Sequence, residues 1–286
     1  MMSDNLNVLT FDIEEWFHLL DYDDTRTEDK WSKYEVRIHK NVDRILDVLE
    51  ESGAKASFFI IGWIAKKYPE IVKKISEKYH VGTHTMNHQL VWQQSKSEFE
   101  KDVEFGIKIL EDIAGKPVNA FRAPGFSIRN SEAWAFDVLQ KYGIKYDCSV
   151  FPSKHAHGGM PVDGVDRPFI VKTENGEIKE FPVSVKNVLG KRLIFSGGGY
   201  FRLCPYFLVR KWARQSAYNM SYIHPRDLDA GQPVLKGLSV VRRFKSYCGL
   251  STAESKLRAF VKDFNFTDIP TADAKINWAS ASKISF

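Results

Sequence analysis

The chain has 286 residues, 43% of them hydrophobic, which is enough to build a sizeable core in one large or two modest domains. Its net charge of +5 is mild and it has no dense Lys/Arg tract, which argues against nucleic-acid binding but is compatible with an anionic substrate or carrier. Its three cysteines are far apart and include no CxxC pair, so a disulfide framework is not expected and a reducing compartment fits.

The N-terminal segment does not have the character of a targeting signal. It lacks a basic leader, and its apolar run is interrupted by Asp12. No apolar stretch approaches the roughly 20 residues needed to span a bilayer. We therefore expect a cytoplasmic protein without a transmembrane segment. If it contributes to a surface polymer, we expect it to act on a precursor inside the cell.

The first half of the chain alternates short apolar runs with amphipathic segments. Helical spacing and glycine stops at Gly53, Gly115 and Gly143 separate these segments, and Ser131 is expected to cap the last helix, with Glu132 in its first turn. The expected strands are 7–11, 56–61, 81–83, 119–122 and 146–150, and the expected helices are 36–49, 69–79, 97–114 and 131–141. This alternation indicates an α/β fold with parallel strands, as a barrel or an open sheet.

After Phe151 the pattern changes. Two strand-like runs within 169–185 flank the sequence ENG, which predicts a hairpin. A helix is expected at 205–217, a strand at 218–223 and an amphipathic helix at 251–264. There is no internal repeat or Gly/Pro/Ser-rich linker, so a single domain with a decorated second half is the simplest interpretation.

Four polar clusters fall at the carboxyl ends of expected strands. They are Asp12 with Glu14, His84 with His88, Arg122, and His224. In parallel α/β barrels the loops at this end build the active site. Four ionisable clusters converging on one rim carry more weight than any of them alone.

The sequence HTMNH places His84 and His88 four residues apart. On a helical turn both rings would point the same way and could bind one metal ion, although such a pair can also be a plain helix surface feature. A carboxylate from FDIEEWF would complete three ligands with a position open for water, as in catalytic zinc sites. In an extended segment Asp12 and Glu14 share a face and Glu15 points away. The alternative is an acidic loop that caps a helix or pairs with lysines.

Two further segments offer catalytic groups. In FRAPGFS, Arg122 could pair with Asp12, and the turn at Gly125 could expose a backbone N–H to an oxyanion. In YIHP, His224 could act as a general acid near neutral pH. An ordinary turn with a surface arginine, and a half-buried structural histidine, are the alternatives. Trp16 and Phe17 are expected in the core.

The ordered motifs TFDIE, HTMNH, RAPGFS and YIHP resemble those of the polysaccharide deacetylase family, carbohydrate esterase family four. The likeness is greatest to a subgroup associated with exopolysaccharide assembly, which also carries a GGGYFR segment, here 197–202, and a C-terminal extension similar to 242–266. It implies a distorted (β/α)7 barrel, taken here as residues 1–230, with 231–286 as an extension packed on it. The family's Asp-containing fourth motif is not apparent around 181–193, and Tyr222 stands where a leucine often lines the acetyl pocket.

The resemblance also implies roles for individual residues. A divalent metal, most often zinc, would be held by Glu14, His84 and His88, with Glu15 as a substitute ligand. By the same resemblance, Asp12 is the base, Arg122 its partner, Gly125 the oxyanion donor and His224 the acid.

The expected activity is metal-dependent removal of an N-acyl group, acetyl by the resemblance, from an amino sugar in a polysaccharide or its precursor. The alternatives are a related amidohydrolase or deformylase acting on a small non-sugar amide, and a non-enzymatic carbohydrate-binding module. The presence of both Asp12 and His224 argues against the module. Trp92, Tyr200 and Phe201 could line a sugar groove, although packing is the expected role for most aromatics. The extension could cover the barrel or mediate a homo-oligomer.

Overall fold

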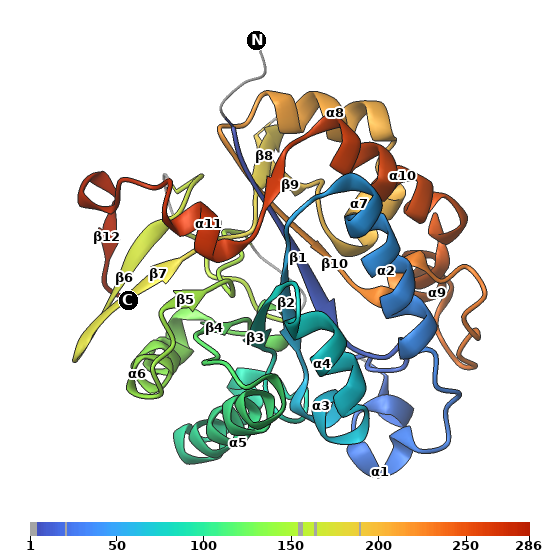
Figure 1. The fold of residues 1–286 in the computed structure, drawn as a ribbon, viewed down its shortest axis with the longest axis horizontal. Helices are drawn as coiled ribbons and strands as arrows, with labels where there is room; N and C mark the ends of the chain where they lie inside the picture. The colour runs from blue at the N-terminus through green and yellow to red at the C-terminus, as the bar shows by residue number, and fades with distance from the viewer. Residues whose placement is uncertain (1–4, 21, 154–156, 163–164, 189) are drawn as a thin grey trace.

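The computed structural model describes residues 5–20, 22–153, 157–162, 165–188 and 190–286. A mostly parallel sheet lies at its centre with helices around it (Figure 1). In the described part the parallel strands, in spatial order, are β10 (Tyr218–Ile223), β1 (Leu6–Ile13), β2 (Ser57–Ile60), β3 (His80–Thr83), β4 (Ala120–Phe121), β5 (Tyr146–Asp147) and β7 (Gly176–Glu180). The predicted α/β fold is confirmed.

The two outer parallel strands, β7 and β10, are not joined by a ladder in the described residues. Side chains span this seam instead. The Ser184 hydroxyl accepts a hydrogen bond from the Met220 N–H at 2.7 Å, and the Ser196 hydroxyl donates to the Met220 carbonyl at 3.0 Å. Gly197 adds an isolated parallel bridge to Tyr222. The backbone ladder is therefore that of an open barrel.

The helices expected from sequence are present, although most are shorter or shifted by a few residues. They are α2 (Ile38–Ser52), α4 (Pro69–Ser76), α5 (Lys96–Ala114), α6 (Trp134–Lys141), α8 (Tyr206–Arg214) and α10 (Leu250–Asp263). The start of α5 is fixed by a capping box, in which the Ser95 hydroxyl accepts from the Glu98 N–H and the Glu98 carboxylate from the Ser95 N–H. The expected Ser131 cap is wrong, because Ser131 lies inside a 3-10 turn, η4 (Asn130–Glu132), and α6 begins after Ala133.

The hairpin predicted around ENG is confirmed as β6 (Phe169–Thr173) and β7, which pair antiparallel. Several elements were not predicted: α1 (Glu28–Trp31), α3 (Gly62–Lys67), α7 (Gly198–Leu203), α9 (Val240–Tyr247), α11 (Ile269–Asp273), and the strands β8 (Val185–Val188), β9 (Lys191–Ile194), β11 (Phe266–Thr267) and β12 (Lys283–Ile284). From the C-terminal part, β11 pairs with β1 and β12 with β6. The division at residue 230 stays a prediction.

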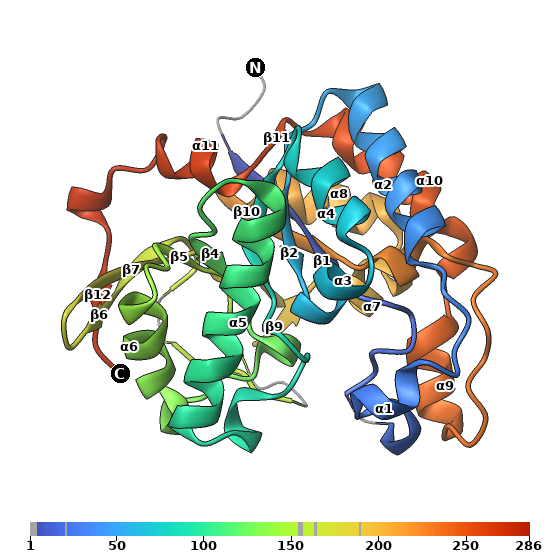
Figure 2. The ribbon, with the colours of Figure 1, turned by 60° about the horizontal axis from the view of Figure 1, so that its bottom comes forward.

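The barrel interior is apolar at one end and polar at the other. Along β1, alternate residues face inward, and Val8 belongs to an apolar cluster with Met220 of β10 and Ile269 of α11. Figure 2 shows α11 and β11 at one end of β1 and α9 toward the other. Further along the inward face of β1 come Thr10 and then Asp12, so the polar residues gather at the carboxyl ends of the strands.

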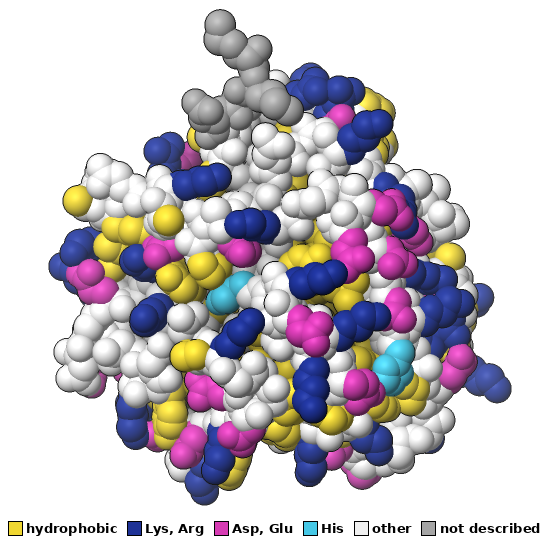
Figure 3. All heavy atoms as spheres, in the orientation of Figure 1, with side chains coloured by type: hydrophobic (Ala, Val, Ile, Leu, Met, Phe, Trp, Pro, Cys, Tyr) yellow, Lys and Arg dark blue, Asp and Glu magenta, His cyan; other side chains and the backbone are white. Residues whose placement is uncertain are grey.

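The surface charges, the helices and the cysteines can each be compared with what the sequence predicts. The face in Figure 3 mixes Lys and Arg with Asp and Glu side chains. No helix among the described residues is both long enough and apolar enough to cross a membrane. Cys148, Cys204 and Cys248 are free thiols, which confirms that no disulfide framework is present.

Candidate active site

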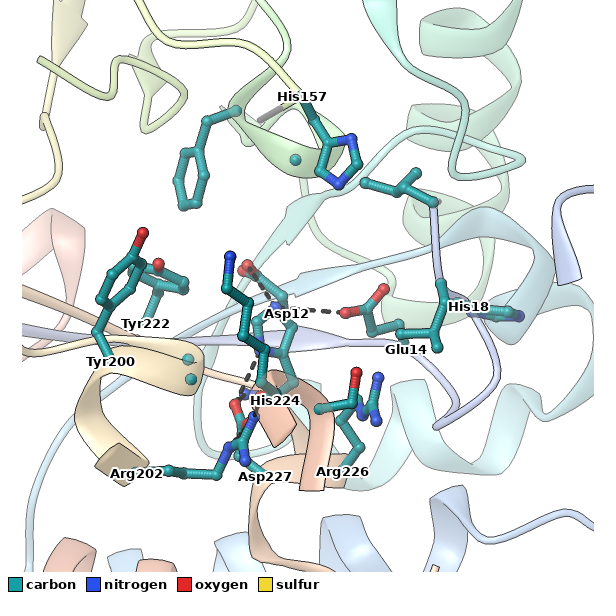
Figure 4. Close-up of a pocket in the computed structure, with 18 of the residues that line it drawn as sticks. Asp12, Glu14, His18, His157, Tyr200, Arg202, Tyr222, His224, Arg226 and Asp227 are labelled. Atoms are coloured by element: carbon teal, nitrogen blue, oxygen red, sulfur yellow. Dashed lines mark hydrogen bonds and ion pairs between the residues drawn. The ribbon is translucent and has the colours of Figure 1, made fainter. Parts of the chain in front are cut away.

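The four polar clusters predicted at strand ends lie together. Asp12 ends the inward face of β1, and His84, Arg122 and His224 directly follow β3, β4 and β10. They surround one end of a cavity of about 590 Å³ whose lining includes Asp12, Glu14, His84, His88, Gly125 and His224 (Figure 4). This volume is in the range of small-molecule sites.

Asp12 is held by Arg122. Oδ1 of Asp12 accepts a hydrogen bond from Nη1 of Arg122 at 2.6 Å, and the same nitrogen donates to the Thr10 hydroxyl at 2.8 Å. The guanidinium has no exposed surface and lies 4.4 Å above the Phe59 ring. Burial alone would lower the pKa of Arg122, but the charge of Asp12, its hydrogen bond to the guanidinium and other neighbouring groups together outweigh it and the pKa is raised. The pair fixes one Asp12 oxygen, and the other remains on the cavity side near His224.

Glu14, His84 and His88 form a group of three potential metal ligands. One ligand atom from each lies within 4.8 Å of the others, and all three residues are buried. This is the three-ligand set, with room for water, that catalytic zinc sites use.

The hydrogen bonds around these residues fit a bound cation. Nδ1 of His84 lies 2.8 Å from the Arg122 carbonyl and donates to it, which leaves the lone pair of Nε2 free. Burial keeps the pKa of His84 well below its usual value, so the ring is neutral, as a ligand must be. Oε2 of Glu14 lies 2.8 Å from Nε2 of His88 but is not aligned for a hydrogen bond, and this buried oxygen has no hydrogen-bond partner in the described chain. A cation shared between them would satisfy both atoms.

The reason given for the histidine pair is wrong in one respect. Residues 84–90 form a loop and not a helical turn, and Thr85 and His88 have positive φ angles of 64° and 55°. The loop is held by Asp102 of α5, whose carboxylate accepts the N–H groups of Met86 and Asn87 at 3.0 and 3.2 Å. The two rings therefore converge because α5 fixes the loop, not because of helical periodicity.

His224 connects the site to a network that sequence analysis missed. Nε2 lies 3.3 Å from Glu14 and 3.7 Å from Asp12, while Nδ1 lies 2.9 Å from Oδ2 of Asp227. The opposite oxygen, Oδ1 of Asp227, accepts from Nε of Arg202 at 2.7 Å. Burial would lower the pKa of His224, but the charges of Glu14, Asp227 and Asp12 and the hydrogen bond to Asp227 together outweigh it and raise the pKa to about 9. The metal-free ring is therefore protonated at neutral pH and able to donate a proton.

The other two guanidinium nitrogens of Arg202 bind the C-terminal part of the chain. Its Nη1 donates to the Cys248 carbonyl at 2.5 Å and its Nη2 to the Lys245 carbonyl at 2.9 Å. The GGGYFR segment thus links the end of α9 to the partner of His224. Tyr200 of this segment lines the cavity, whereas Phe201 is 1% exposed and belongs to the core.

Two glycines shape the wall beside this chemistry. Gly125 has a φ of 59°, and a Cβ there would lie 2.8 Å from Leu20 and 2.9 Å from His157. A Cβ on Gly197 would lie 2.1 Å from the Tyr222 ring, which itself lines the cavity. The Gly125 N–H makes no hydrogen bond to the described residues, which leaves it able to donate to a ligand.

The other acidic and aromatic residues of FDIEEWF have structural positions. Oε1 of Glu15 accepts the N–H groups of Arg37 and Ile38 at 2.8 and 3.0 Å, so Glu15 caps α2 and is not a substitute ligand. The core position predicted for Trp16 and Phe17 is confirmed, with 3% and 1% exposure. Trp92 is half-buried and donates to the His157 carbonyl.

Several other cavity residues were also missed: His18, His157, Arg226, Asp227, Arg242 and Lys245. Only Asp227 had a usable sequence signal, because the spacing His224-x-x-Asp227 allows a carboxylate to reach back to a histidine that precedes a 3-10 turn. His18 is buried, and its Nε2 has no hydrogen-bond partner in the described residues.

Two known family profiles match this chain, and each covers part of the site. The profile described as polysaccharide deacetylase matches residues 7–147. Residues 7–147 are a polysaccharide deacetylase domain. A second profile, described as a domain of unknown function, matches residues 148–273, and the boundary between the two falls at the end of β5 within the sheet. His224 and Asp227 therefore lie in the second profile, while the other polar clusters lie in the first.

Curated relatives are similar to part of this chain. A peptidoglycan-N-acetylglucosamine deacetylase of Bacillus cereus is 35% identical over 94 residues, which are 32% of this chain and 34% of that protein. A chitooligosaccharide deacetylase of Azorhizobium caulinodans is 33% identical over 106 residues, 35% of this chain and 48% of that protein. The matched segments thus span about a third to a half of the length of these relatives.

Solved structures show the same fold at low identity. A Mycobacterium smegmatis protein assigned to the polysaccharide deacetylases has a TM-score of 0.66 at 17% identity, with 100% of this chain and 94% of that chain covered. A pseudoenzyme of carbohydrate esterase family four from Bacillus anthracis has a TM-score of 0.50 at 12% identity, with 95% and 66% covered. Since the fold also occurs in a pseudoenzyme, the case for activity depends on the site residues.

Proposed function

We propose that this protein is a metal-dependent N-deacetylase of amino sugars. One observation carries the proposal: a three-ligand set, Glu14, His84 and His88, lies beside Asp12 and His224 at the end of one cavity. A base and an acid next to an open metal position can together hydrolyse an amide. The acetyl group and the amino sugar follow from the names of the relatives, which act on N-acetylglucosamine and chitooligosaccharides.

Asp12 is the proposed base. When bound by Glu14, His84 and His88, a divalent metal polarises the amide carbonyl and makes water a stronger acid. Asp12 takes the proton of the attacking water with Oδ2, because Oδ1 is engaged by Arg122. The Gly125 N–H donates to the oxygen that becomes negatively charged, in the turn Pro124–Phe126.

His224 is the proposed acid. An amide nitrogen must be protonated to leave as an amine, and His224 presents Nε2 to the same end of the cavity. Asp227 accepts a hydrogen bond from Nδ1–H of His224, so the proton that the charged ring gives up is the one on Nε2. The products are a carboxylate and an amine. In the net reaction one water molecule supplies the new carboxylate oxygen and the proton that the leaving nitrogen gains.

The finer assignments are also part of the proposal. A carboxylate and two imidazoles suit zinc, and we assign zinc as the resident metal. The three free thiols favour work in a reducing compartment. The cavity volume of about 590 Å³ admits one or two sugar rings and not a buried polymer.

The test is release of acetate from N-acetylglucosamine oligosaccharides by the zinc-loaded protein. We expect Asp12→Asn and His224→Ala each to lower turnover by about 10²–10⁴-fold. Asp263→Asn, which alters a surface carboxylate paired with Arg210, is the matched control. If the protein hydrolyses ureides or N-formyl compounds and not these sugars, the alternative amidohydrolase function replaces this one. A variant that keeps nearly the wild-type rate removes its residue from the mechanism.

A further inference from the structure

The cavity extends well beyond the proposed zinc ligands. Its lining continues from His224 to residues of α9 and the segment before it, including Ser239, Arg242 and Lys245. Figure 4 shows Arg202 and Arg226 beside Asp227 on the side of His224 away from Asp12. Cationic side chains therefore form the wall that faces away from the metal end. The family profile that covers this wall has no assigned function.

Arg226 is an unusual cation for this position. Arg226 is only 8% exposed. Among the residues that the structure describes, no carboxylate lies within ion-pair distance of its guanidinium. Its one hydrogen bond to another side chain runs from Nη2 to Oε1 of Gln232, at 2.9 Å. A buried guanidinium is costly unless an anion compensates it. The nearest acid, Asp227, is occupied by Arg202 and His224.

The orientation of Arg226 is fixed by its surroundings. The Gln232 amide donates to the carbonyls of Arg226 and Asp229 at 2.7 and 2.9 Å, which locks the amide with its oxygen toward the guanidinium. The planar fork is therefore held in place before any ligand arrives. A preorganised guanidinium that lines a cavity is suited to two-point binding of a carboxylate or a phosphate.

Lys245 supplies a second positive charge to the same cavity. Its side chain lies on α9, is exposed to solvent and lines the cavity. Its ammonium makes no ion pair in the described residues, while its backbone carbonyl is held by Arg202. Arg243, on the same helix and also exposed, is not part of the lining. Lys245 and Arg243 are thus suited to a comparison of variants, because both are exposed cations of α9 and only Lys245 lines the cavity.

We propose that Arg226 and Lys245 form an anion-binding subsite, so that the substrate is an N-acylated amino sugar carrying a negatively charged group. The anion is a phosphate ester or a carboxylate attached to the sugar that undergoes deacylation, or to its neighbour. The subsite compensates the buried guanidinium of Arg226 and holds the charged end of the substrate while the amide lies at Glu14, His84 and His88. This inference rests on the proposed deacetylase function for the identity of the sugar, but the anion site stands on its own geometry.

The test compares binding and turnover for three sugars with the zinc-loaded full chain. The probes are N-acetylglucosamine 1-phosphate, N-acetylmuramic acid and neutral N-acetylglucosamine oligosaccharides, and calorimetry gives the dissociation constants. We expect at least one anionic sugar to bind more tightly than the neutral one, and its binding to weaken as ionic strength rises. Lys245→Ala should weaken that binding about three- to fivefold, Arg226→Gln by more, and Arg243→Ala not at all. The affinity for neutral sugars should fall less in Lys245→Ala than the affinity for the anionic sugar.

The phosphate and the carboxylate probes show which of the two anions the subsite binds. The proposal holds if either anionic sugar binds more tightly than the neutral one and loses affinity in Lys245→Ala. Equal losses in Lys245→Ala and Arg243→Ala would overturn the proposal, as would equal affinity for neutral and anionic sugars. If Arg226→Gln does not fold, the comparison of Lys245→Ala with Arg243→Ala still decides. Binding of the anionic sugar without acetate release would retain the subsite and refute the deacetylase. Acetate release from neutral sugars, together with equal binding of the anionic sugars by the wild type and Lys245→Ala, would refute the subsite and retain the deacetylase.

Discussion

Replacing Asp227 by asparagine tests the network that positions the proposed acid. One Asp227 oxygen accepts from the backbone N–H and the ring of His224, at 3.0 and 2.9 Å, and the other accepts from Arg202 at 2.7 Å. Asparagine has the same shape but offers one oxygen and one NH₂ group. If the oxygen faces Arg202, the NH₂ group points at Nδ1 of His224. Because an NH₂ group donates, it favours an unprotonated Nδ1 and so disfavours the charged ring, which carries protons on both nitrogens. If the oxygen faces His224, the buried Arg202 loses its anion.

Both orientations of the new amide in Asp227→Asn lower activity. Loss of a correctly protonated acid is expected to lower kcat by about 10²–10⁴-fold, which is about 3–5 kcal/mol in the activation free energy. Breaking a buried ion pair by removing one charge also costs about 3–5 kcal/mol in the free energy of unfolding. The assays are acetate release from an N-acetylated sugar and urea unfolding, with bound zinc measured in both proteins. A kcat within about threefold of the wild type would refute the role given to Asp227, since the acid accounts for at least about 10²-fold, and Asp263→Asn is the control for the isosteric change.

Three further predictions concern titration and packing. In the metal-free chain, NMR should give His224 a pKa of about 9, and kcat/KM of the loaded enzyme should fall as pH rises through the pKa of the ring, because the acid loses its proton; a ring that titrates near 6.5, the usual pKa of histidine, contradicts this. Gly197→Ala, whose Cβ meets the Tyr222 ring, should cost about 1–3 kcal/mol in urea unfolding, whereas Gly199→Ala, with no contact under 3.4 Å, should cost less; equal losses refute the packing argument. Burial and a neighbouring carboxylate raise the pKa of Glu180 well above its usual value, so the stability of the folded state falls as pH rises above the usual pKa of a glutamate. Unfolding of Glu180→Gln from about pH 5 to 8 should therefore show a stability gain over the wild type that grows by up to about 1.4 kcal/mol per pH unit, and a constant difference rules this out.

The positions of the site residues along the chain could be predicted because parallel strands deliver their carboxyl ends to one edge. Asp12, Arg122 and His224 follow short apolar runs whose strand character is evident from sequence alone. The histidine pair was found for a partly wrong reason, since spacing of four suggests a helix and the loop is instead held by Asp102. That carboxylate lies on α5, 14 residues after His88, and no local pattern connects the two.

The wall beyond His224 could not be predicted because α9, which supplies Lys245, lacks a buried apolar stripe. On α9 the apolar residues Val240, Val241 and Phe244 are 85%, 64% and 57% exposed, so hydrophobic periodicity gives no sign of what the helix covers. Arg226 and Lys245 are 19 positions apart and meet only through the cavity that they line. Burial of a guanidinium without a paired carboxylate among the described residues, which makes Arg226 informative, is a property of the folded chain and not of the sequence.

The central claim, that Glu14, His84 and His88 hold one metal ion beside Asp12 and His224, is most directly tested by crystallography of the zinc-loaded protein with anomalous scattering at the zinc edge. We predict one strong peak at about 2.0–2.2 Å from a Glu14 oxygen and from one nitrogen of each histidine. A peak elsewhere, or an ion at this place that leaves Glu14 or either ring unbound, would contradict the account.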